Sequence, residues 1–428
     1  MRRAALGAAS ILVGALALTA ACGSGLGTPP PTRVPGSSPS ATPSGARTPQ
    51  TPGSGSPGAG ASFRELSDFP TEGAFEVTGV IATAEGFVAV GFGAADDDDD
   101  YFGPRQGIIW RSADGQTWEG FRDSALANVT PMDIAALGGD LFMLGALKTC
   151  GEGRGCSEGP EAGNSIWRSS AGGPWQRLPP PASMQEALGV DGLIADTDRL
   201  VAFGSAADEG ETPTVWSSID GQTWSQTSAL AGLDLVTALG ATPDGFVAFG
   251  TVPRADGGSN DLAAAVSPDA ASFGAAVVPS LPDAAVDDVA VGAGGLVGVG
   301  RSFTGEDIDL RALALFSTDG SSWAEGLATD ESFTDAYLVA AHAVPAGYVA
   351  IGFRLDDSDF AVQAGQAWIS ADGQRWRSMA SIGEASLFTA SAAGTPGLVV
   401  FSADQFEDES GVPSTIAAWF APSSALSD

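Results

Sequence analysis

The sequence predicts an all-β fold, a seven-bladed β-propeller built from four-stranded antiparallel blades. A short apolar run that ends in glycine or serine occurs seven times. Its last residue falls at positions 91, 145, 204, 250, 300, 352 and 402, a spacing of 46 to 59 residues. An aromatic residue follows six of these runs, and no segment carries a sustained helical period. A repeat near 50 residues with short alternating segments is typical of propeller blades.

Four strands are expected in each repeat. The first is short and rich in small residues, as at 77–81 and 235–239, because inner strands converge on the propeller axis. The second is the apolar run. The third ends near a residue such as Trp110, Trp167, Trp216 or Trp368, and the fourth begins at Trp118, Trp175, Trp224, Phe273, Trp323 or Trp376.

The last repeat has a third strand at 416–420 but no clear fourth strand. The segment 62–66, which contains Phe63, resembles the fourth strands of the other repeats. We therefore expect this N-terminal strand to complete the last blade. Such closure removes an exposed sheet edge.

The N-terminus has the pattern of an export signal. Residues 1–21 combine Arg2 and Arg3 with an apolar run and a small-residue exit, which predicts a signal peptide. Cys22 follows directly, and the site resembles a bacterial lipoprotein processing site, although leucine stands one place early. The resemblance implies a thiol acylated by palmitate or a similar chain, and a protein anchored by lipid on the extracytoplasmic side of the cell membrane. Ordinary secretion with a free Cys22 is the alternative.

Residues 22–62 form the lipidated cysteine and a linker rich in Pro, Gly and Ser, and residues 63–428 form the propeller. The whole chain has 19 basic and 52 acidic residues, a net charge of −33. Since residues 1–62 hold four arginines and no acid, the propeller carries 15 − 52 = −37. Such a charge excludes nucleic acid as a partner, because nucleic-acid affinity depends on basic residues.

Similar turns join the expected third and fourth strands. Each turn has serine, then aspartate, and in most copies glycine directly after the aspartate; the aspartates are Asp114, Asp220, Asp269, Asp319 and Asp372. Asp-Gly suits a tight hairpin, since glycine accepts positive φ and the carboxylate accepts backbone N–H bonds. The turns resemble the Asp-box (BNR) repeats of sialidase-like propellers, except that Asp and Gly are adjacent here. The resemblance implies that these aspartates are structural and not catalytic.

A sialidase-type enzyme would need clustered arginines, a tyrosine nucleophile with a glutamate, and a proton donor. Arg254, Arg301 and Arg354 follow three successive second strands, and together they could clamp a carboxylate. The alternative is that each pairs with a nearby acid. No residue is assigned as catalytic, and Tyr348 is expected in the core.

The same loops carry much of the acid, including Asp96, Asp98, Asp100, Asp356 and Asp359. Loops that return to the axis are expected to add others, among them Asp287 and Asp288. Three interpretations stay open: a solvated acidic surface, a docking face for a basic partner, and a Ca²⁺ site. No other cofactor is expected.

Cys150 and Cys156 flank a short loop, and in an exported protein they are expected to form a disulfide; a free or metal-binding pair is the alternative. His342, the one histidine, is expected to be structural. The sequence thus favours a lipid-anchored extracytoplasmic propeller that binds or scaffolds an unknown protein or glycan. The alternative is a sialidase-like glycoside hydrolase acting on an acidic glycan.

Overall fold

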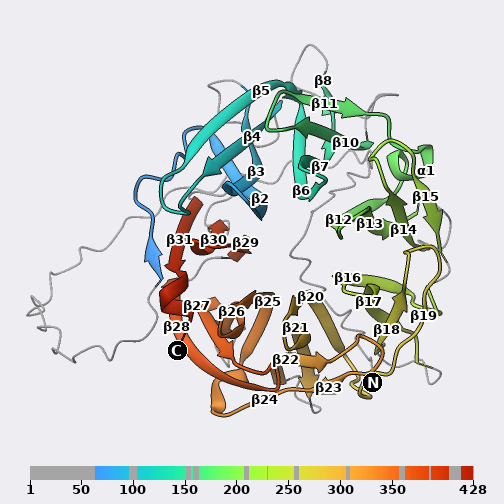
Figure 1. Ribbon diagram of the computed structural model, residues 1–428, viewed down its shortest axis with the longest axis vertical. Helices are drawn as coiled ribbons and strands as arrows, with labels where there is room; N and C mark the ends of the chain where they lie inside the picture. The colour runs from blue at the N-terminus through green and yellow to red at the C-terminus, as the bar shows by residue number, and fades with distance from the viewer. Residues whose placement is uncertain are drawn as a thin grey trace, which may run out of the picture. The chain divides into compact units, whose positions relative to one another are not determined.

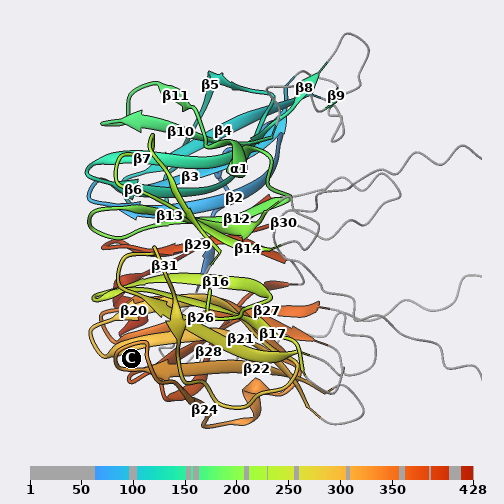
Figure 2. The ribbon, with the colours of Figure 1, turned by 90° about the vertical axis from the view of Figure 1, so that its right-hand side faces the viewer.

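Seven four-stranded antiparallel sheets form a ring in the computed structural model (Figure 1). The structure describes residues 63–95, 104–150, 156–157, 163–206, 212–228, 230–254, 260–304, 309–355, 362–384, 387–403 and 416–427. The predicted all-β, seven-bladed propeller is confirmed. The blades stand side by side around the axis when the ring is viewed from its side (Figure 2).

Each blade runs from an inner strand to an outer strand in chain order. Blades 1 to 3 contain β2 (Ala74–Thr83), β3 (Gly86–Ala94), β4 (Arg105–Ser112) and β5 (Glu119–Ala127); β6 (Val129–Leu137), β7 (Asp140–Leu147), β10 (Gly163–Ser170) and β11 (Trp175–Leu178); and β12 (Gly189–Ala195), β13 (Leu200–Ser205), β14 (Pro213–Ser218) and β15 (Ser225–Thr227). Blades 4 and 5 contain β16 (Leu235–Thr242), β17 (Gly245–Val252), β18 (Asp261–Ser267) and β19 (Gly274–Ala275); and β20 (Ala284–Gly292), β21 (Gly295–Thr304), β22 (Asp309–Ser317) and β23 (Ala324–Glu325).

Blade 6 contains β25 (Ala336–Val344), β26 (Gly347–Leu355), β27 (Val362–Ser370) and β28 (Arg375–Glu384), with β24 (Leu327–Ala328) added in parallel beside β28. Blade 7 contains β29 (Leu387–Ala393), β30 (Gly397–Ala403) and β31 (Ile416–Pro422), completed by β1 (Arg64–Glu65). The remaining elements are the hairpin β8 (Thr149–Cys150) and β9 (Cys156–Ser157), the one-turn helix α1 (Ala182–Gln185), and the 3₁₀ turns η1 (Glu331–Phe333) and η2 (Ser423–Leu426). Within the described ranges, no helix has the length and apolar character needed to cross a membrane.

The N-terminal strand closes the ring, as the sequence predicts. β1 pairs with β31 in antiparallel register, Glu65 opposite Trp419, and the N–H of Leu66 bonds to the carbonyl of Ala418 at 2.8 Å. Phe69 then packs against Trp118 of blade 1 and Phe401 of blade 7, with ring centroids 5.8 and 5.2 Å apart. The closing segment therefore buries aromatic surface between the first and last blades.

Two expectations about strand ends were wrong. Arg301 and Arg354 lie inside β21 and β26, and not in the loops that follow, so only Arg254 lies beyond its strand. Asp287 and Asp288 lie within the inner strand β20 and not in a loop. In each case backbone pairing continues through polar residues that the apolar pattern alone does not include.

Candidate functional site: the channel wall

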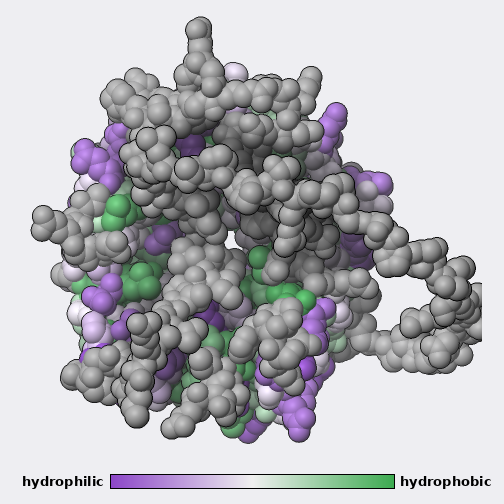
Figure 3. All heavy atoms as spheres, turned by 180° about the vertical axis from the view of Figure 1, so that it is seen from behind, coloured by the Kyte–Doolittle hydropathy of each residue, from purple (hydrophilic) through white to green (hydrophobic). Residues whose placement is uncertain are grey.

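The seven inner strands surround the propeller axis, and we call them the channel wall: β2, β6, β12, β16, β20, β25 and β29 (Figure 1). The ring is open at its centre in the space-filling view from behind (Figure 3). Every inner strand has a register shift at the same place, which inserts one extra residue opposite the second strand: Thr78, Met132, Asp191, Thr237, Asp287, Val339 and Thr389. Bulges of this kind re-aim side chains and are common near functional sites.

Two bulge threonines join their blade to the next one. Thr78 Oγ1 donates to the carbonyl of Pro131 at 3.0 Å, and Thr237 Oγ1 donates to the carbonyl of Val286 at 2.6 Å. In both cases the acceptor stands just before the bulge of the following inner strand. The bulge therefore serves as a point of contact between neighbouring blades.

Asp133 and Asp288 follow the bulge directly in blades 2 and 5. Asp133 accepts the N–H of Ile134 and, across the blade boundary, the N–H of Leu193, both at 2.8 Å. Asp288 accepts the N–H of Val289 at 2.7 Å and that of Ala341 in blade 6 at 2.9 Å. The two carboxylates thus make the same interblade contact at two places in the ring.

Burial raises the pKa of both groups to about 6, although the accepted N–H bonds oppose this effect. The charge of Asp288 raises the pKa of Asp133 further, and that of Asp287 acts on Asp288. The charged form of a carboxylate is disfavoured among apolar neighbours and other carboxylates, so protonation becomes easier. The channel wall therefore holds acids that titrate close to neutral pH.

Asp287 is neutralised by an arginine from its own blade. Arg301 Nη1 lies 3.2 Å from Asp287 Oδ1 and donates to Tyr337 Oη at 2.6 Å, and its guanidinium lies 4.8 Å from the centre of the Tyr337 ring. Burial raises the pKa of Asp287, and Arg301 opposes that rise. Burial, followed by the charge of Asp287, also raises the pKa of the Tyr337 phenol. The phenol therefore stays protonated at neutral pH.

Asp191 and Glu76 add two further acids to the channel wall. Water reaches the Asp191 side chain, but protein surrounds it on most sides, and this partial burial raises its pKa. Burial raises the pKa of Glu76 to about 7, against the attraction of Arg105. The wall thus carries acids from blades 1, 2, 3 and 5.

His342 lies in the inner strand β25, as expected. Its Nε2 is 2.7 Å from Ser391 Oγ in β29, which links blades 6 and 7. Burial lowers the pKa of the imidazole to about 4, so the ring is neutral at physiological pH. These contacts agree with a structural role.

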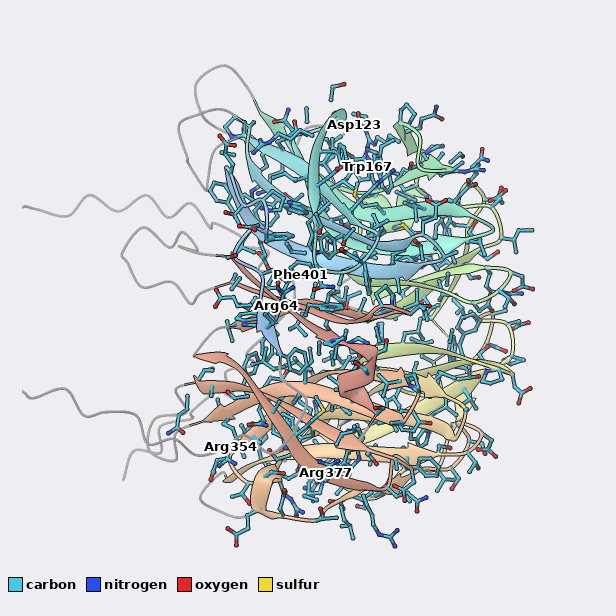
Figure 4. All side chains as sticks on the ribbon, turned by 60° about the vertical axis from the view of Figure 1, so that its left-hand side comes forward. Arg64, Asp123, Trp167, Arg354, Arg377 and Phe401 are labelled. Carbon is cyan, nitrogen blue, oxygen red and sulfur yellow. The ribbon has the colours of Figure 1, made fainter. Side chains whose placement is uncertain are left out.

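The three candidate arginines do not occupy equivalent positions. Arg301 follows Gly300 directly, Arg354 stands two residues after Gly352, and Arg254 stands four residues after the end of its apolar run. Arg301 is engaged by Asp287 and Tyr337, and Arg254 lies 3.8 Å from an Asp261 carboxylate oxygen. Figure 4 labels Arg354 in blade 6. A carboxylate clamp made by all three arginines remains a prediction.

The recurring aspartate turns are held by dense local bonding. Asp114 Oδ1 accepts the N–H groups of Thr117 at 2.7 Å and Gln116 at 2.8 Å. Gly115 has φ +74°, and a Cβ there would lie 2.6 Å from the Phe420 ring, so only glycine fits. Trp118 Nε1 donates back to the Gly115 carbonyl at 3.1 Å.

The other turns repeat this arrangement to different degrees. The aspartates at Asp220, Asp319 and Asp372 accept backbone N–H groups at 2.8 to 2.9 Å, and Asp269 accepts one at 3.0 Å. The bond from Thr117 leads the contacts that lower the pKa of Asp114, and the bond from Thr223 does so for Asp220. These carboxylates are therefore ionised acceptors built into hairpins.

Several predicted site residues lie outside the described residues: Cys22, Asp96, Asp98, Asp100, Asp356 and Asp359. Across the ranges that the structure does describe, no group of three His, Cys, Asp or Glu residues could hold a metal ion. Cys150 stands opposite Cys156 in the β8–β9 hairpin, at Cα partner positions. Directly opposed residues of an antiparallel pair have the Cα separation that a disulfide needs, so the predicted bond fits the register.

Sequence reasoning missed Asp133 and the interblade role of Asp288. The position after the bulge holds glycine or alanine in the other five blades: Gly79, Gly192, Ala238, Ala340 and Ala390. An aspartate within an otherwise apolar inner strand was the available signal. It becomes visible only when the repeats are aligned on their first strands.

The fold defines the class, a seven-bladed β-propeller. Solved structures with a similar fold include a sialidase from Trypanosoma rangeli, which is 15% identical with a TM-score of 0.41, over 82% of this chain and 54% of the sialidase. The phage phi92 endosialidase is 11% identical, with a TM-score of 0.43, over 85% of this chain and 69% of its own. The β-propeller domain of the Trilobed protease from Pyrococcus furiosus is 9% identical, with a TM-score of 0.46, over 81% and 93%.

This chain therefore spans about half the length of the Trypanosoma sialidase. No family model matches the sequence, and no curated protein matches it either. At these identities the likeness concerns the fold alone.

Proposed function

We propose that the protein is a lipid-anchored extracytoplasmic binding module whose propeller docks a basic partner at the channel wall. The observation that carries this proposal is the set of carboxylates in the inner strands, Asp133, Asp191, Asp287 and Asp288, of which only Asp287 has an ion-pair partner among the described residues. Unpaired acids lining an opening attract cationic groups over a distance set by the ionic strength.

The partner test compares two single-charge variants of blade 3. Asp191→Asn removes a carboxylate from the channel wall, and Asp198→Asn removes one whose side chain is 71% exposed in the turn between β12 and β13. In pull-downs from envelope extracts, we expect partner recovery to fall at high salt and in Asp191→Asn, and to be unchanged in Asp198→Asn. Equal recovery with both variants, insensitive to salt, would contradict docking at the channel wall.

Anchoring is tested separately. Mass spectrometry of the N-terminal peptide should find acyl chains on Cys22, and Cys22→Ser should release the protein from the membrane fraction. An unmodified Cys22 in secreted protein would support the alternative of ordinary secretion.

A glycoside hydrolase of sialidase type is the second candidate, and the contact between Arg301 and Tyr337 is the observation that favours it. Two features weigh against it. Tyr337 is 8% exposed with a raised pKa, and Arg301 is already paired with Asp287. Hydrolysis of a fluorogenic sialoside that is lost in Tyr337→Phe would support the enzyme over the binding module.

A further inference from the structure

The contacts made by Asp133 and Asp288 divide the ring in two. Asp133 joins blades 2 and 3 through Leu193, and Asp288 joins blades 5 and 6 through Ala341. Between these two boundaries lie blades 3, 4 and 5 on one side, and blades 6, 7, 1 and 2 on the other. The other five blades have no side chain beyond Cβ at this position. The two boundaries are therefore held by a device that the remaining boundaries lack.

The charged and titratable groups around Asp133 come from the strands packed against β6. They are Glu76 on β2, Arg105 and Arg111 on β4, Asp140 on β7, Arg168 on β10 and Asp191 on β12. Arg168 is paired with Asp140, and Arg105 bonds to Thr130. In this part of the described chain, no cation forms an ion pair with Asp133.

The groups around Asp288 are arranged similarly. They are Asp287 on β20, Asp261 on β18, Arg301 on β21, Arg311 on β22, Tyr337 and His342 on β25, and Tyr348 and Arg354 on β26; β16 and β17 contribute none. Arg301 is engaged by Asp287 and Tyr337, and His342 is neutral. Among the described residues, Asp288 has backbone N–H groups as partners and no cation.

A carboxylate in this situation has two comparable states. When ionised, it makes two short charge-assisted bonds, but it is poorly hydrated and repelled by its neighbours. When protonated, one oxygen becomes a hydroxyl, so that repulsion disappears and the bonds to Leu193 or Ala341 become neutral and weaker. The proton comes from solvent in the open channel, and no other bond changes.

We propose that Asp133 and Asp288 form a pair of proton-operated contacts that loosen the boundaries between blades 2 and 3 and between blades 5 and 6 when the surroundings become mildly acidic. Net stability moves the opposite way, because the folded state holds these protons more tightly than the unfolded chain does. The local weakening is therefore separable from the global change.

The test follows backbone amide resonances of the intact propeller between pH 7.5 and 3. The amides of Leu193 and Ala341 should titrate with a midpoint near pH 6. Gln116 and Thr117, which bond to Asp114 in the same way, serve as internal references and should titrate below pH 3.8. After correction for intrinsic rates, hydrogen exchange at Leu193 and Ala341 should be at least threefold faster at pH 5 than at pH 7.5.

Two variants assign the effect. Asp133→Asn should abolish the titration of Leu193 and leave that of Ala341, and Asp288→Asn should do the reverse. The proposal is overturned if both amides in the native protein titrate together with Gln116 and Thr117, or if their exchange is unchanged by pH. Both of these measurements use the native protein, so a variant that does not fold leaves the proposal testable.

Discussion

Arg64 in β1 pairs with Phe420 in β31, so a residue near the N-terminal end of the propeller completes the sheet formed by the last repeat. Arg64 Nη2 also donates to Gln116 Oε1 at 2.6 Å, in the aspartate turn of blade 1. The labelled Arg64 and Phe401 lie where the first and last blades meet (Figure 4). One short strand therefore binds both sides of the closure.

Removal of residues 63–70 should destabilise the propeller strongly. It exposes the surfaces that Leu66 and Phe69 cover, and we expect a loss of about 5 kcal/mol in the free energy of unfolding. Phe69→Ala alone should cost about 3 kcal/mol, whereas Ser67→Ala, at an exposed position, should change little. Thermal and urea unfolding measure both effects. An unchanged transition after the deletion would contradict closure by β1.

The aspartate turns should contribute unequally to stability. Asp114→Ala loses two backbone bonds and should cost about 1 kcal/mol, the low end for charged acceptors because the site is exposed. Asp269→Ala loses one such bond and should cost less. The lowered pKa of Asp114 means that its contribution is present above pH 3.8 and disappears as the pH falls through the folded value. Equal costs in urea unfolding would refute this ranking.

Glu76 should make the propeller less stable in alkali. Its folded pKa of about 7 exceeds the unfolded value of 4.5, so its contribution is complete below pH 4.5 and is lost as the pH rises through 7. Glu76→Gln should therefore raise the free energy of unfolding at pH 8, on the order of 2 kcal/mol, and change it little at pH 4.5. Melting temperatures at the two pH values measure the difference. A variant that is destabilised equally at both would show that Arg105 keeps Glu76 ionised.

His342 should act in the opposite direction. Its folded pKa of about 4 lies below the unfolded value of 6.5, so its contribution is complete above pH 6.5 and is lost as the pH falls toward 4. His342→Gln should therefore flatten the decline of the melting temperature over this interval. Ser391→Ala keeps the imidazole and removes its partner, so it should preserve the decline. If both variants flatten the curve alike, the hydrogen bond and not the imidazole charge controls the decline.

The cysteines of the β8–β9 hairpin should be oxidised. We expect a thiol reagent to label neither Cys150 nor Cys156 in denatured, unreduced protein from an oxidising compartment, and to label both after reduction. The opposed register of the two residues is the structural reason. Labelling before reduction would leave the free or metal-binding pair as the remaining interpretation.

Much of the fold could be predicted because the repeats carry redundant signals. Seven apolar runs, the turns around residues such as Asp114, and the strand-like segment at Phe63 each point to the same ring. The channel wall was harder to predict, since its chemistry depends on which residue follows a bulge in each inner strand. Periodicity identifies a strand but does not locate a one-residue shift, so the bonds from Asp133 to Leu193 and from Asp288 to Ala341 needed coordinates.

The arginines illustrate a second limit. Their order along the chain suggested one cluster, but each stands at a different distance from the glycine that ends its apolar run, and alternate strand residues face opposite sides of a sheet. Arg301 therefore meets Asp287 and Tyr337, and Arg254 meets Asp261. A difference of one residue in register was enough to change the partners.

The chain that precedes residue 63 leaves the propeller from its closing strand. A pull applied to that chain therefore loads the two residue pairs of β1 and β31 before it loads any other sheet. Beyond them, the next resistance is the aromatic contact of Phe69 with Trp110, Trp118 and Phe401. Mechanical resistance of the propeller to such a pull is thus set by a few residues at one junction, whatever the thermodynamic stability of the remaining blades.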